Sequence, residues 1–244
     1  MLIEARNIVK AFGAFKAVND ASVDVGEGEI VGLIGPNGAG KSTFFNCLTG
    51  DLPPTSGTVT FGGVDVTQMP PEARAKLGLA RSFQVPLTFE SMSVLDNATI
   101  GALLRHPKAA DARAKARDVL EKVGLARLAD TPARSLGTPG RKRLEIARAL
   151  ASEPKALLLD EAMAGLTPTE VRAAIDLVRR IHGTGITIVI VEHIMEVIVS
   201  LAERVVVFHQ GREIARGTPR QVTSDPAVIE AYLGRRRVKH GTEP

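Results

Sequence analysis

The sequence contains little cysteine and no long apolar run, and both features narrow the kinds of protein it can encode. Cys47 is the one cysteine among 244 residues, so no disulfide can form within the chain and nothing indicates a secreted, cross-linked fold. No stretch approaches the roughly 20 consecutive apolar residues that a membrane-spanning helix needs. The N-terminus mixes acid and base, Glu4 and Arg6, where a secretory signal would be basic and then apolar. We therefore expect a cytosolic protein, or one attached to a membrane through other chains.

The charge balance is basic but only slightly so. Hydrophobic residues make up 44% and charged residues 24% of the chain, and its formal net charge is +4. These values are typical of a globular protein with a large core. A basic excess can indicate nucleic acid or an anionic membrane surface as a partner. Much of the excess lies in Arg235, Arg236, Arg237 and Lys239, where a solvated tail is the simpler interpretation.

Apolar periodicity indicates strands that alternate with helices, without a fixed-period repeat or a low-complexity segment. Strands are predicted at residues 2–9, 22–25, 30–34, 58–61, 64–66, 79–83, 156–159, 187–191 and 204–208. Helices are predicted at residues 41–49, from 70–71 onward, and at 112–123, 141–150, 169–181 and 194–201. Such alternation predicts an α/β fold with a mainly parallel sheet. The strand-rich start and the helical middle predict two lobes.

A glycine-rich loop follows the apolar strand 30–34. Gly35-Pro36-Asn37-Gly38-Ala39-Gly40-Lys41-Ser42 fits the phosphate-binding pattern G-x-x-x-x-G-K-[ST] in full. Glycines let the backbone curl until its N–H groups point at phosphate oxygens, and the following helix adds its positive end. Lys41 would then reach the β- and γ-phosphates, Ser42 would ligate Mg²⁺, and Thr43 would contact the α-phosphate. A purely structural glycine turn is the alternative, and the strand before and helix after this loop argue against it.

Polar residues also end three other predicted strands. Asp160 and Glu161 follow strand 156–159, at the sheet edge where parallel sheets bind ligands. Asp160 is predicted to hold Mg²⁺, directly or through water, and Glu161 to polarise water against the γ-phosphate. His193 follows strand 187–191 and is predicted to face the same crevice and bind the γ-phosphate. Gln84 ends strand 79–83, where it would meet Mg²⁺ or the attacking water. Taken singly, each of these could be a solvated strand end.

The ordered set resembles the nucleotide-binding subunit of an ATP-binding-cassette (ABC) transporter over nearly the whole chain. The elements that carry the resemblance are the loop at Gly35, Gln84, Leu159-Asp160-Glu161, Ala164-Gly165-Leu166 and His193. The resemblance implies ATP and Mg²⁺ as cofactors and makes Lys41, Gln84, Glu161 and His193 the catalytic set. Phe12 matches the family's adenine-stacking aromatic, although a core phenylalanine is the alternative. Residues 164–168 match the loop that touches a partner subunit.

The family's layout implies one domain over residues 1–244. A parallel core with an N-terminal antiparallel β part would occupy about 1–93 and 151–235. An α-helical subdomain would occupy about 94–150, and residues 236–244 would form a basic tail.

Within the family, the chain most resembles the branched-chain amino acid (Liv-type) importers. The carriers are residues 143–150, 163–170 and the ending 217–219, 225–226 and 229–234. This resemblance implies an ATPase subunit that couples hydrolysis to uptake of branched-chain amino acids or a related small polar solute. It implies a second ATPase subunit, two membrane permeases and, indirectly, a periplasmic or lipid-anchored solute-binding protein. The expected location is the cytoplasmic face of the membrane, peripherally bound, with no nucleic-acid partner. Residues from 84 to about 97 would help receive a permease helix.

The chain departs from the family at its signature segment, normally Leu-Ser-Gly-Gly-Gln. Leu136 is followed here by Gly137, Thr138, Pro139 and Gly140, so the serine that contacts the partner's γ-phosphate is missing. Thr138 is expected to be an N-cap and Pro139 the first helical residue. Intact loop motifs beside a degraded signature favour a heterodimer with a second cassette subunit that carries an intact signature. A homodimer is the alternative.

Two other functional classes remain open. A regulatory module with weak hydrolysis is favoured by the degraded signature and opposed by Glu161 and His193. A non-transport cassette in DNA repair or translation usually carries two cassettes or a long coiled coil, and this chain has one cassette and no sustained heptads. The transported substrate contacts other chains, so this sequence does not specify it.

Overall fold

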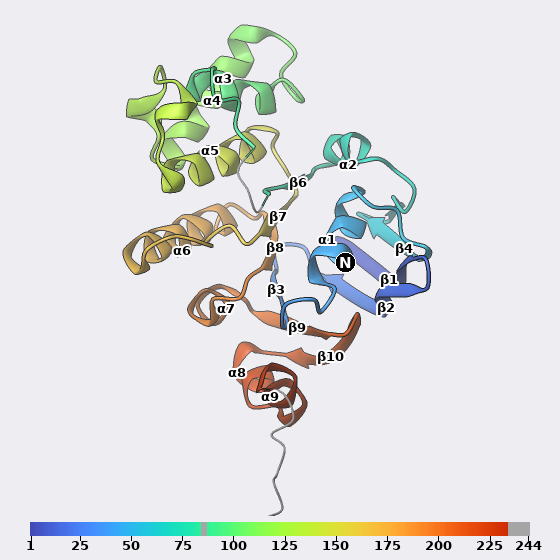
Figure 1. Ribbon diagram of the computed structural model, residues 1–244. Helices are drawn as coiled ribbons and strands as arrows, with labels where there is room; N and C mark the ends of the chain where they lie inside the picture. The colour runs from blue at the N-terminus through green and yellow to red at the C-terminus, as the bar shows by residue number, and fades with distance from the viewer. Residues whose placement is uncertain (84–86, 234–244) are drawn as a thin grey trace, which may run out of the picture.

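The computed structural model describes residues 1–83 and 87–233, which form an α/β fold with two separate sheets (Figure 1). The strands are β1 (Ile3–Phe12), β2 (Phe15–Val25), β3 (Ile30–Ile34), β4 (Ser56–Phe61), β5 (Val64–Asp65), β6 (Leu79–Arg81), β7 (Ala156–Asp160), β8 (Thr187–Val191), β9 (Arg204–His209) and β10 (Arg212–Gly217). The helices are α1 (Lys41–Thr49), α2 (Pro71–Leu77), α3 (Val94–Ala102), α4 (Ala109–Lys122), α5 (Thr138–Ala151), α6 (Pro168–His182), α7 (Met195–Leu201), α8 (Pro219–Thr223) and α9 (Pro226–Leu233), with short 3-10 turns at Ala126–Leu128 and Ala133–Ser135. Gln84 and the tail 236–244 lie outside the described residues.

The larger sheet confirms the predicted mainly parallel core. Its order is β10-β9-β3-β8-β7-β6, with parallel pairing throughout except for the antiparallel edge strand β10. β3 is buried on both faces, which explains its continuous apolar sequence. Ile30 and Ile34 pack against the helices, whereas Val31 and Leu33 join a second core shared with α1 and the smaller sheet. The strand that leads into the phosphate loop is therefore held by both cores.

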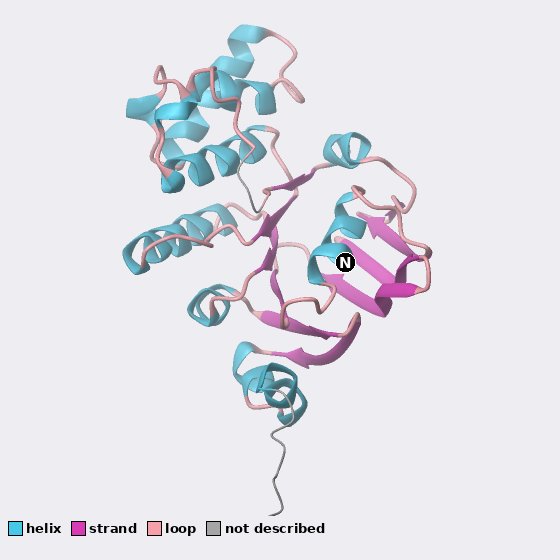
Figure 2. Cartoon of the chain, viewed as in Figure 1, coloured by secondary structure: helices cyan, strands magenta, loops and turns pink. Residues whose placement is uncertain are grey.

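The smaller sheet confirms the predicted antiparallel N-terminal part, in the order β2-β1-β4-β5 (Figure 2). The strand predictions at 2–9 and 22–25 were too short, because β1 and β2 run on until Phe12 pairs with Phe15 across a turn. Gly13 has φ of 60° in that turn. The added strand length is largely exposed or half-buried and carries polar residues, so it lacks the apolar alternation that indicates a strand.

Strand β10 was not predicted at all. It is a mostly half-buried edge strand, and its sequence REIARG contains three charged residues and two glycine or alanine positions that give no periodicity. It pairs with β9 through a tight turn at Gln210 and Gly211, where φ is 49° and 77°. Positive φ at both positions is the geometry of a two-residue hairpin turn.

Helices α3, α4 and α5 pack together as a helical lobe at the β6 edge of the larger sheet (Figures 1 and 2). This lobe agrees with the helical character predicted for residues 94–150. Helix α3 begins where the Ser93 hydroxyl accepts a hydrogen bond from the Asp96 N–H at 3.0 Å. Helix α4 buries Ala112, Ala116 and Val119 against its neighbours, at the three- and four-residue spacing of an amphipathic helix.

The far end of α1 is fixed by a fully buried guanidinium. Arg74 is 1% exposed and donates hydrogen bonds to the carbonyls of Cys47 at 2.8 Å and Leu48 at 2.7 Å. A cation at the C-terminal end of a helix satisfies its last carbonyls and complements its dipole. The helix whose first turn follows the phosphate loop is therefore held at both ends.

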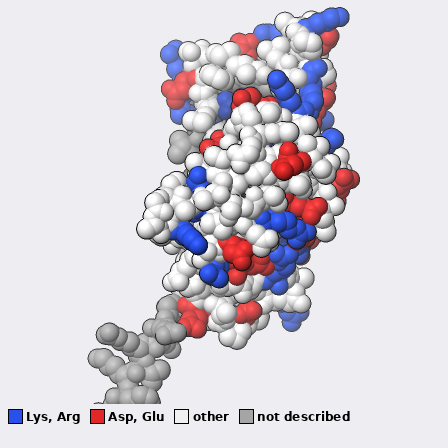
Figure 3. All heavy atoms as spheres, turned by 90° about the vertical axis from the view of Figure 1, so that its right-hand side faces the viewer, with Lys and Arg blue, Asp and Glu red and all other residues white. Residues whose placement is uncertain are grey.

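The surface gives no sign of a single dominant charge on the face seen in Figure 3. Basic and acidic side chains are interspersed there between uncharged areas. Within the part of the chain that the structure describes, no helix combines the length and hydropathy required to cross a membrane.

Candidate active site

Two glycines of the phosphate loop are required by close backbone contacts. Gly35 has φ of 150°, and a Cβ there would lie 2.2 Å from the carbonyl oxygen of Phe208. Gly40, the N-cap of α1, has φ of 97°, and its Cβ would lie 2.3 Å from the carbonyl oxygen of Ala17. Any side chain would displace a neighbouring strand at either position, so the loop can take this path only with glycine.

The side chain of Lys41 turns back into the phosphate loop. Its side chain is buried, and Nζ donates hydrogen bonds to the carbonyls of Gly35 at 2.7 Å and Pro36 at 3.1 Å. Burial lowers the pKa of Lys41, while the carboxylates of Glu161 and Asp160 act to raise it. The ammonium is thus held at the centre of the loop, where phosphate oxygens would replace the carbonyls as partners.

A cavity of about 620 Å³ opens beside the loop. Its lining comprises Phe15, Ala17, Asn37, Gly38, Ala39, Gly40, Lys41, Ser42, Thr43, Glu161 and His193. The structure therefore gathers most of the predicted loop together with the predicted acid and histidine, which come from three separate strand ends. Gly35, Pro36, Asp160 and Phe12 are not among the lining residues. A cavity of this size is in the range of small-ligand sites.

Asp160 ends β7, directly before the cavity-lining Glu161, and is mostly buried. Arg81 Nη2 donates to its carboxylate at 3.4 Å, a contact that the sequence alone did not indicate. Burial raises the pKa of Asp160 and nearby Glu161 adds to the rise, whereas Arg81 and Lys41 oppose it. The carboxyl groups of Asp160 and Glu161 thus lie near the cationic groups of Arg81 and Lys41. A bound metal ion or phosphate would change this balance of charge.

Glu161 has an unusual backbone for a residue that is not glycine. Its φ is 45°, in the left-handed region, which costs of the order of 1 kcal/mol or more and persists only where neighbours enforce it. Its N–H donates to the Val191 carbonyl at 2.9 Å, and its carbonyl accepts from the Ala164 N–H at 3.1 Å. The loop after β7 is therefore tied both to β8 and to itself.

The same carbonyl of Glu161 has a second partner, from the helical lobe. Lys142 of α5 is only 7% exposed, and its Nζ donates to the Glu161 carbonyl at 3.2 Å. Burial lowers the pKa of Lys142, and Glu192, Glu145 and Glu161 act to raise it. The sequence placed Lys142 in a basic run at the start of a helix, with nothing local to mark it as buried.

Glu192 is a second residue whose position the sequence did not reveal. It is 1% exposed, directly before His193, and its Oε1 accepts a hydrogen bond from the Met163 N–H at 2.9 Å. Burial raises the pKa of Glu192. The carboxyl group therefore links the end of β8 to the loop that follows β7, so His193 and Glu161 are held relative to each other.

The signature segment begins α5, with one correction to the expected boundary. Thr138 is the first helical residue, and Gly137 is the N-cap, with φ of −68° and ψ of 170° and no side-chain cap. Thr138 is therefore not the N-cap, because the helix starts one residue earlier than expected and Pro139 falls in its first turn. Gly137 and Thr138 are exposed, and none of Gly137, Thr138, Pro139 and Gly140 lines the cavity.

An aromatic residue at the cavity was also missed. Phe15 lines the cavity, whereas Phe12, its pairing partner across the hairpin turn, is 50% exposed with the Lys10 ammonium 5.4 Å from its ring centre. The hairpin pairs Phe12 with Phe15, and the sequence distinguished only Phe12, by its position in a motif.

The segments on either side of residue 84 are held by a buried acid. Glu145 of α5 is buried, and its Oε1 accepts from the Phe83 N–H at 3.1 Å and the Leu87 N–H at 3.4 Å. Burial raises the pKa of Glu145, and these two backbone donors oppose the rise. The described residues that flank Gln84 are thus attached to the helical lobe.

The arrangement as a whole can bind a polyphosphate and position water beside it. Backbone N–H groups, a helix N-terminus and a buried ammonium form one wall, and a carboxylate and an imidazole form the other. Comparison with known protein families agrees with this chemistry. A family model described as ABC transporter matches residues 18–164, and one described as branched-chain amino acid ATP-binding cassette transporter matches residues 212–238.

The chain belongs to the ABC transporter family, as an ATP-binding cassette with ATPase activity. It is 38% identical to the high-affinity branched-chain amino acid transport ATP-binding protein LivG of Salmonella typhimurium, over 96% of this chain and 98% of LivG. It is 35% identical to BraF of Pseudomonas aeruginosa, which carries the same description, over 96% of this chain and 98% of BraF. It is also 36% identical to the lipopolysaccharide export system ATP-binding protein LptB of Acidithiobacillus ferridurans, over 96% and 97%.

Solved structures give the same result for the fold. A nucleotide-free ATP-binding cassette from an ABC transporter superimposes with a TM-score of 0.87 at 33% identity, covering 96% of this chain and 99% of that one. The ADP conformation of MJ1267, also an ATP-binding cassette of an ABC transporter, gives 0.87 at 34% identity over 96% and 98%. The predicted cassette fold is confirmed.

Proposed function

We propose that this chain powers uptake of branched-chain amino acids, or of a related small polar solute, by hydrolysing ATP. The observation that carries the proposal is the cavity that joins the phosphate loop to Glu161 and His193, in a chain whose C-terminal segment matches the branched-chain amino acid cassette model. The similarity to LivG and BraF supports import. Lipopolysaccharide export, the role printed for LptB, is the competing direction.

Within this function each loop residue has a proposed task. Backbone groups of residues 35–40 and the start of α1 receive the phosphates, Lys41 supplies charge to the β- and γ-phosphates, and Thr43 contacts the α-phosphate. Glu161 orients the attacking water, and His193 binds the γ-phosphate. The single-domain layout, with a core, a helical lobe and a basic tail, is part of the same proposal. Phe12 and the cavity-lining Phe15 are the two aromatic rings available for adenine.

Mg²⁺ fits the residues at the site as a companion of ATP. Among the residues that the structure describes, no group of three or more histidine, cysteine, aspartate or glutamate side chains could hold a metal. Mg²⁺ commonly keeps few protein ligands and takes phosphate oxygens and water for the rest. Ser42 in the cavity wall and Asp160 at the end of β7 are the proposed protein ligands, with Gln84 as a third. The ion would neutralise charge that develops on the γ-phosphate.

The partner for dimerisation is proposed to be a second, different cassette subunit. Gly137 and Thr138 are exposed at the start of α5 and lie outside this chain's own cavity, which suits a segment that serves the ATP of a partner. Without the signature serine, the site built on the partner's loop would be impaired. The site built on this chain's loop would be competent if the partner carries an intact signature.

A groove on the helical lobe is the proposed contact with the permeases. Leu87, Thr88, Phe89, Ile100 and Arg148 line a cavity of about 510 Å³ there. Leu87 is 54% and Phe89 47% exposed, and large apolar side chains that are exposed side by side are typical of an interaction surface. Asn97 fixes the loop beneath, since it accepts from the Phe89 N–H at 2.8 Å and donates to the Phe89 carbonyl at 3.0 Å.

The groove implies how the two cassettes would be assembled with the permeases. Two permeases would receive the two cassettes at the cytoplasmic face of the cell membrane, where this chain would be peripherally bound. A periplasmic or lipid-anchored solute-binding protein would act on the permeases from the other side.

The test is transport by the reconstituted complex. The chain, its second cassette and both permeases are placed in proteoliposomes with the binding protein, and uptake of labelled leucine is measured with and without ATP. Glu161→Gln should lower both hydrolysis and uptake by about a hundredfold or more while ATP still binds. Glu27→Gln, on an exposed turn, is the matched control and should leave both unchanged.

Either of two outcomes would contradict the proposal. Hydrolysis by the Glu161→Gln complex at the wild-type rate would show that the competent site is elsewhere. ATP hydrolysis that the complex couples to no amino-acid uptake would exclude the proposed transport reaction.

A further inference from the structure

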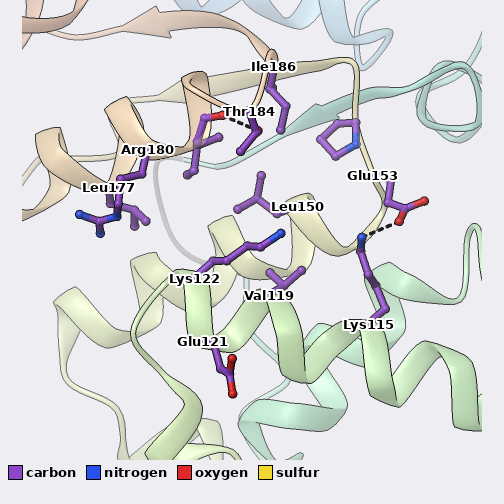
Figure 4. Close-up of a pocket in the computed structure, with 12 residues that line it drawn as sticks. Lys115, Val119, Glu121, Lys122, Leu150, Glu153, Leu177, Arg180, Thr184 and Ile186 are labelled. Carbon is purple, nitrogen blue, oxygen red and sulfur yellow. Dashed lines mark hydrogen bonds and ion pairs between the residues drawn. The ribbon is translucent and has the colours of Figure 1, made fainter.

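A second large pocket lies between the helical lobe and the parallel core, and it shares no lining residue with the ATP cavity. It has a volume of about 650 Å³, comparable to that of the ATP cavity. Its walls come from α4 and the end of α5 on one side and from α6 and the segment leading to β8 on the other (Figure 4). A molecule in this inter-lobe pocket would touch both lobes at once.

The floor of the inter-lobe pocket is aliphatic. It is formed by Val119, Leu150, Pro154, Leu177, Ile181 and Ile186. All except Ile186 are buried by their neighbours. Pockets for small ligands typically combine such an apolar floor with a few polar groups that fix orientation. The floor therefore selects for a ligand with an aliphatic body.

Charged side chains surround this floor, and among those drawn in the described part of the chain Lys122 reaches across it. Lys115 is paired with Glu153, at 2.5 Å between Nζ and Oε1. Figure 4 shows that the carboxylate of Glu121 points away from the floor, whereas the side chain of Lys122 extends over it beneath Leu150. Within residues 1–83 and 87–233, no hydrogen bond or ion pair is found for the Lys122 ammonium.

An ammonium above an aliphatic floor defines the chemistry of the ligand. We propose that the inter-lobe pocket binds a small amphipathic monoanion, an aliphatic carboxylate whose chain lies on the floor and whose head group pairs with Lys122. Arg180, on the neighbouring helix α6, adds positive charge at the rim. A neutral ligand would leave this charge unpaired, and a purely polar anion would gain nothing from the floor.

The site is distinct from the nucleotide site in both residues and chemistry. None of its lining residues belongs to the phosphate loop, to the two strand ends with Glu161 and His193, or to the permease groove. Binding can therefore be measured without ATP, so its outcome is independent of the proposed transport function.

The experiment uses the full chain with methyl-labelled isoleucine and hexanoate as the probe. Ile181 and Ile186 report on the inter-lobe pocket, and Ile34, next to the phosphate loop, reports on anion binding there. Hexanoate should shift the methyl signals of Ile181 and Ile186 saturably and leave that of Ile34 in place. Hexanamide, the neutral isostere, should bind about fivefold more weakly, since it lacks the charge that pairs with the ammonium of the exposed Lys122.

Variants on one helix separate charge from structure. Lys122→Ala should weaken hexanoate binding by about fivefold and remove the preference over hexanamide, whereas Lys122→Arg should retain both. Arg117→Ala removes an exposed charge from the same helix α4 away from the pocket and is the matched control. The proposal is overturned if hexanoate moves Ile34 instead of the pocket signals. It is equally overturned if the pocket signals do not move, or if Lys122→Ala and Arg117→Ala behave alike.

Discussion

The phosphate loop and the signature segment are held in place by very different surroundings. Gly35 and Gly40 lie against the carbonyls of Phe208 and Ala17, so the loop's sequence is dictated by contacts within this chain. At Gly137 an added Cβ would meet only the Pro139 ring, at 3.8 Å. A segment that faces outward can lose its motif without any cost to the fold. Folding of this chain therefore constrains the sequence of the phosphate loop, which is its own half of an ATP site. It does not constrain the signature segment, whose sequence is left to selection for function with a partner.

The largest effect is expected from breaking the contact between the signature helix α5 and Glu161, which lines the same cavity as the phosphate loop. Lys142 joins the signature helix to the backbone of Glu161, and Lys142→Met removes that hydrogen bond while keeping an unbranched side chain. We expect kcat for ATP hydrolysis to fall by about ten- to a hundredfold, because in the proposed role of Glu161 a small displacement of its carboxylate is costly. The KM for ATP should change little, since Lys142 does not line the cavity.

Steady-state ATPase kinetics on the assembled transporter measure the change in kcat separately from the change in KM. Lys142→Arg should recover part of the rate, because it keeps a buried donor. Arg143→Met, the next residue on the same helix, is the control for charge and helix stability. An unchanged kcat, or a KM that moves as much as kcat, would show that Lys142 does not position Glu161.

A smaller effect is expected from restoring the missing serine. Gly137→Ser fits sterically, and its φ of −68° and ψ of 170° suit an N-cap serine. In a heterodimer this serine would serve only the partner's ATP. The ATPase rate of the complex should therefore rise by about twofold at most, because one site is already competent and the added donor repairs the other.

The Gly137→Ser variant also distinguishes a heterodimer from a homodimer. In a homodimer both sites lack the serine, so Gly137→Ser would raise the rate by about tenfold or more. Phosphate release by the purified complex distinguishes these values. Combining Gly137→Ser with Glu161→Gln should leave measurable hydrolysis in a heterodimer, from the repaired site alone. A large gain in the single variant would exclude the heterodimer.

The smallest effect concerns stability. Burial raises the pKa of Glu192, so the folded state holds its proton more tightly than the unfolded state does. Stability from this group is complete below the unfolded pKa of about 4.3 and is lost as pH rises through the higher folded pKa. Glu192→Gln keeps an acceptor for Met163 and carries no charge. The variant should therefore be more stable than the wild type at neutral pH, with a difference that shrinks as the pH falls toward 4.3.

Urea unfolding of the isolated chain between pH 5 and 8 tests this sign, with exposed Glu121→Gln as the control. A difference that grows as the pH falls would mean that the Glu192 carboxylate stabilises the fold in its charged form.

Much of the fold and half of the site could be predicted from the sequence, because local sequence patterns determine both. Continuous apolar strands and the glycine pattern are local signals, and the residue that ends each strand follows from them. Lys142 and Glu192 are buried only because α5 and β8 meet the loop after β7, and nothing in their sequence neighbourhoods shows this. Phe15 and β10 were missed for a related reason, since both lie on half-exposed hairpins without apolar periodicity. Helix α5 also starts one residue earlier than expected, at Thr138, with Gly137 as its N-cap.

The hydrogen bond from Lys142 to the Glu161 carbonyl has a consequence for the time at which ATP is hydrolysed. It measures 3.2 Å, and a shift of the helical lobe by about 1 Å along it would break it. The left-handed backbone of Glu161 would then lose one of the contacts that enforce it. With the proposed role of Glu161 in hydrolysis, this contact would make the alignment of the acid depend on the position of the helical lobe, so the time of hydrolysis would depend on that position as well as on the arrival of ATP.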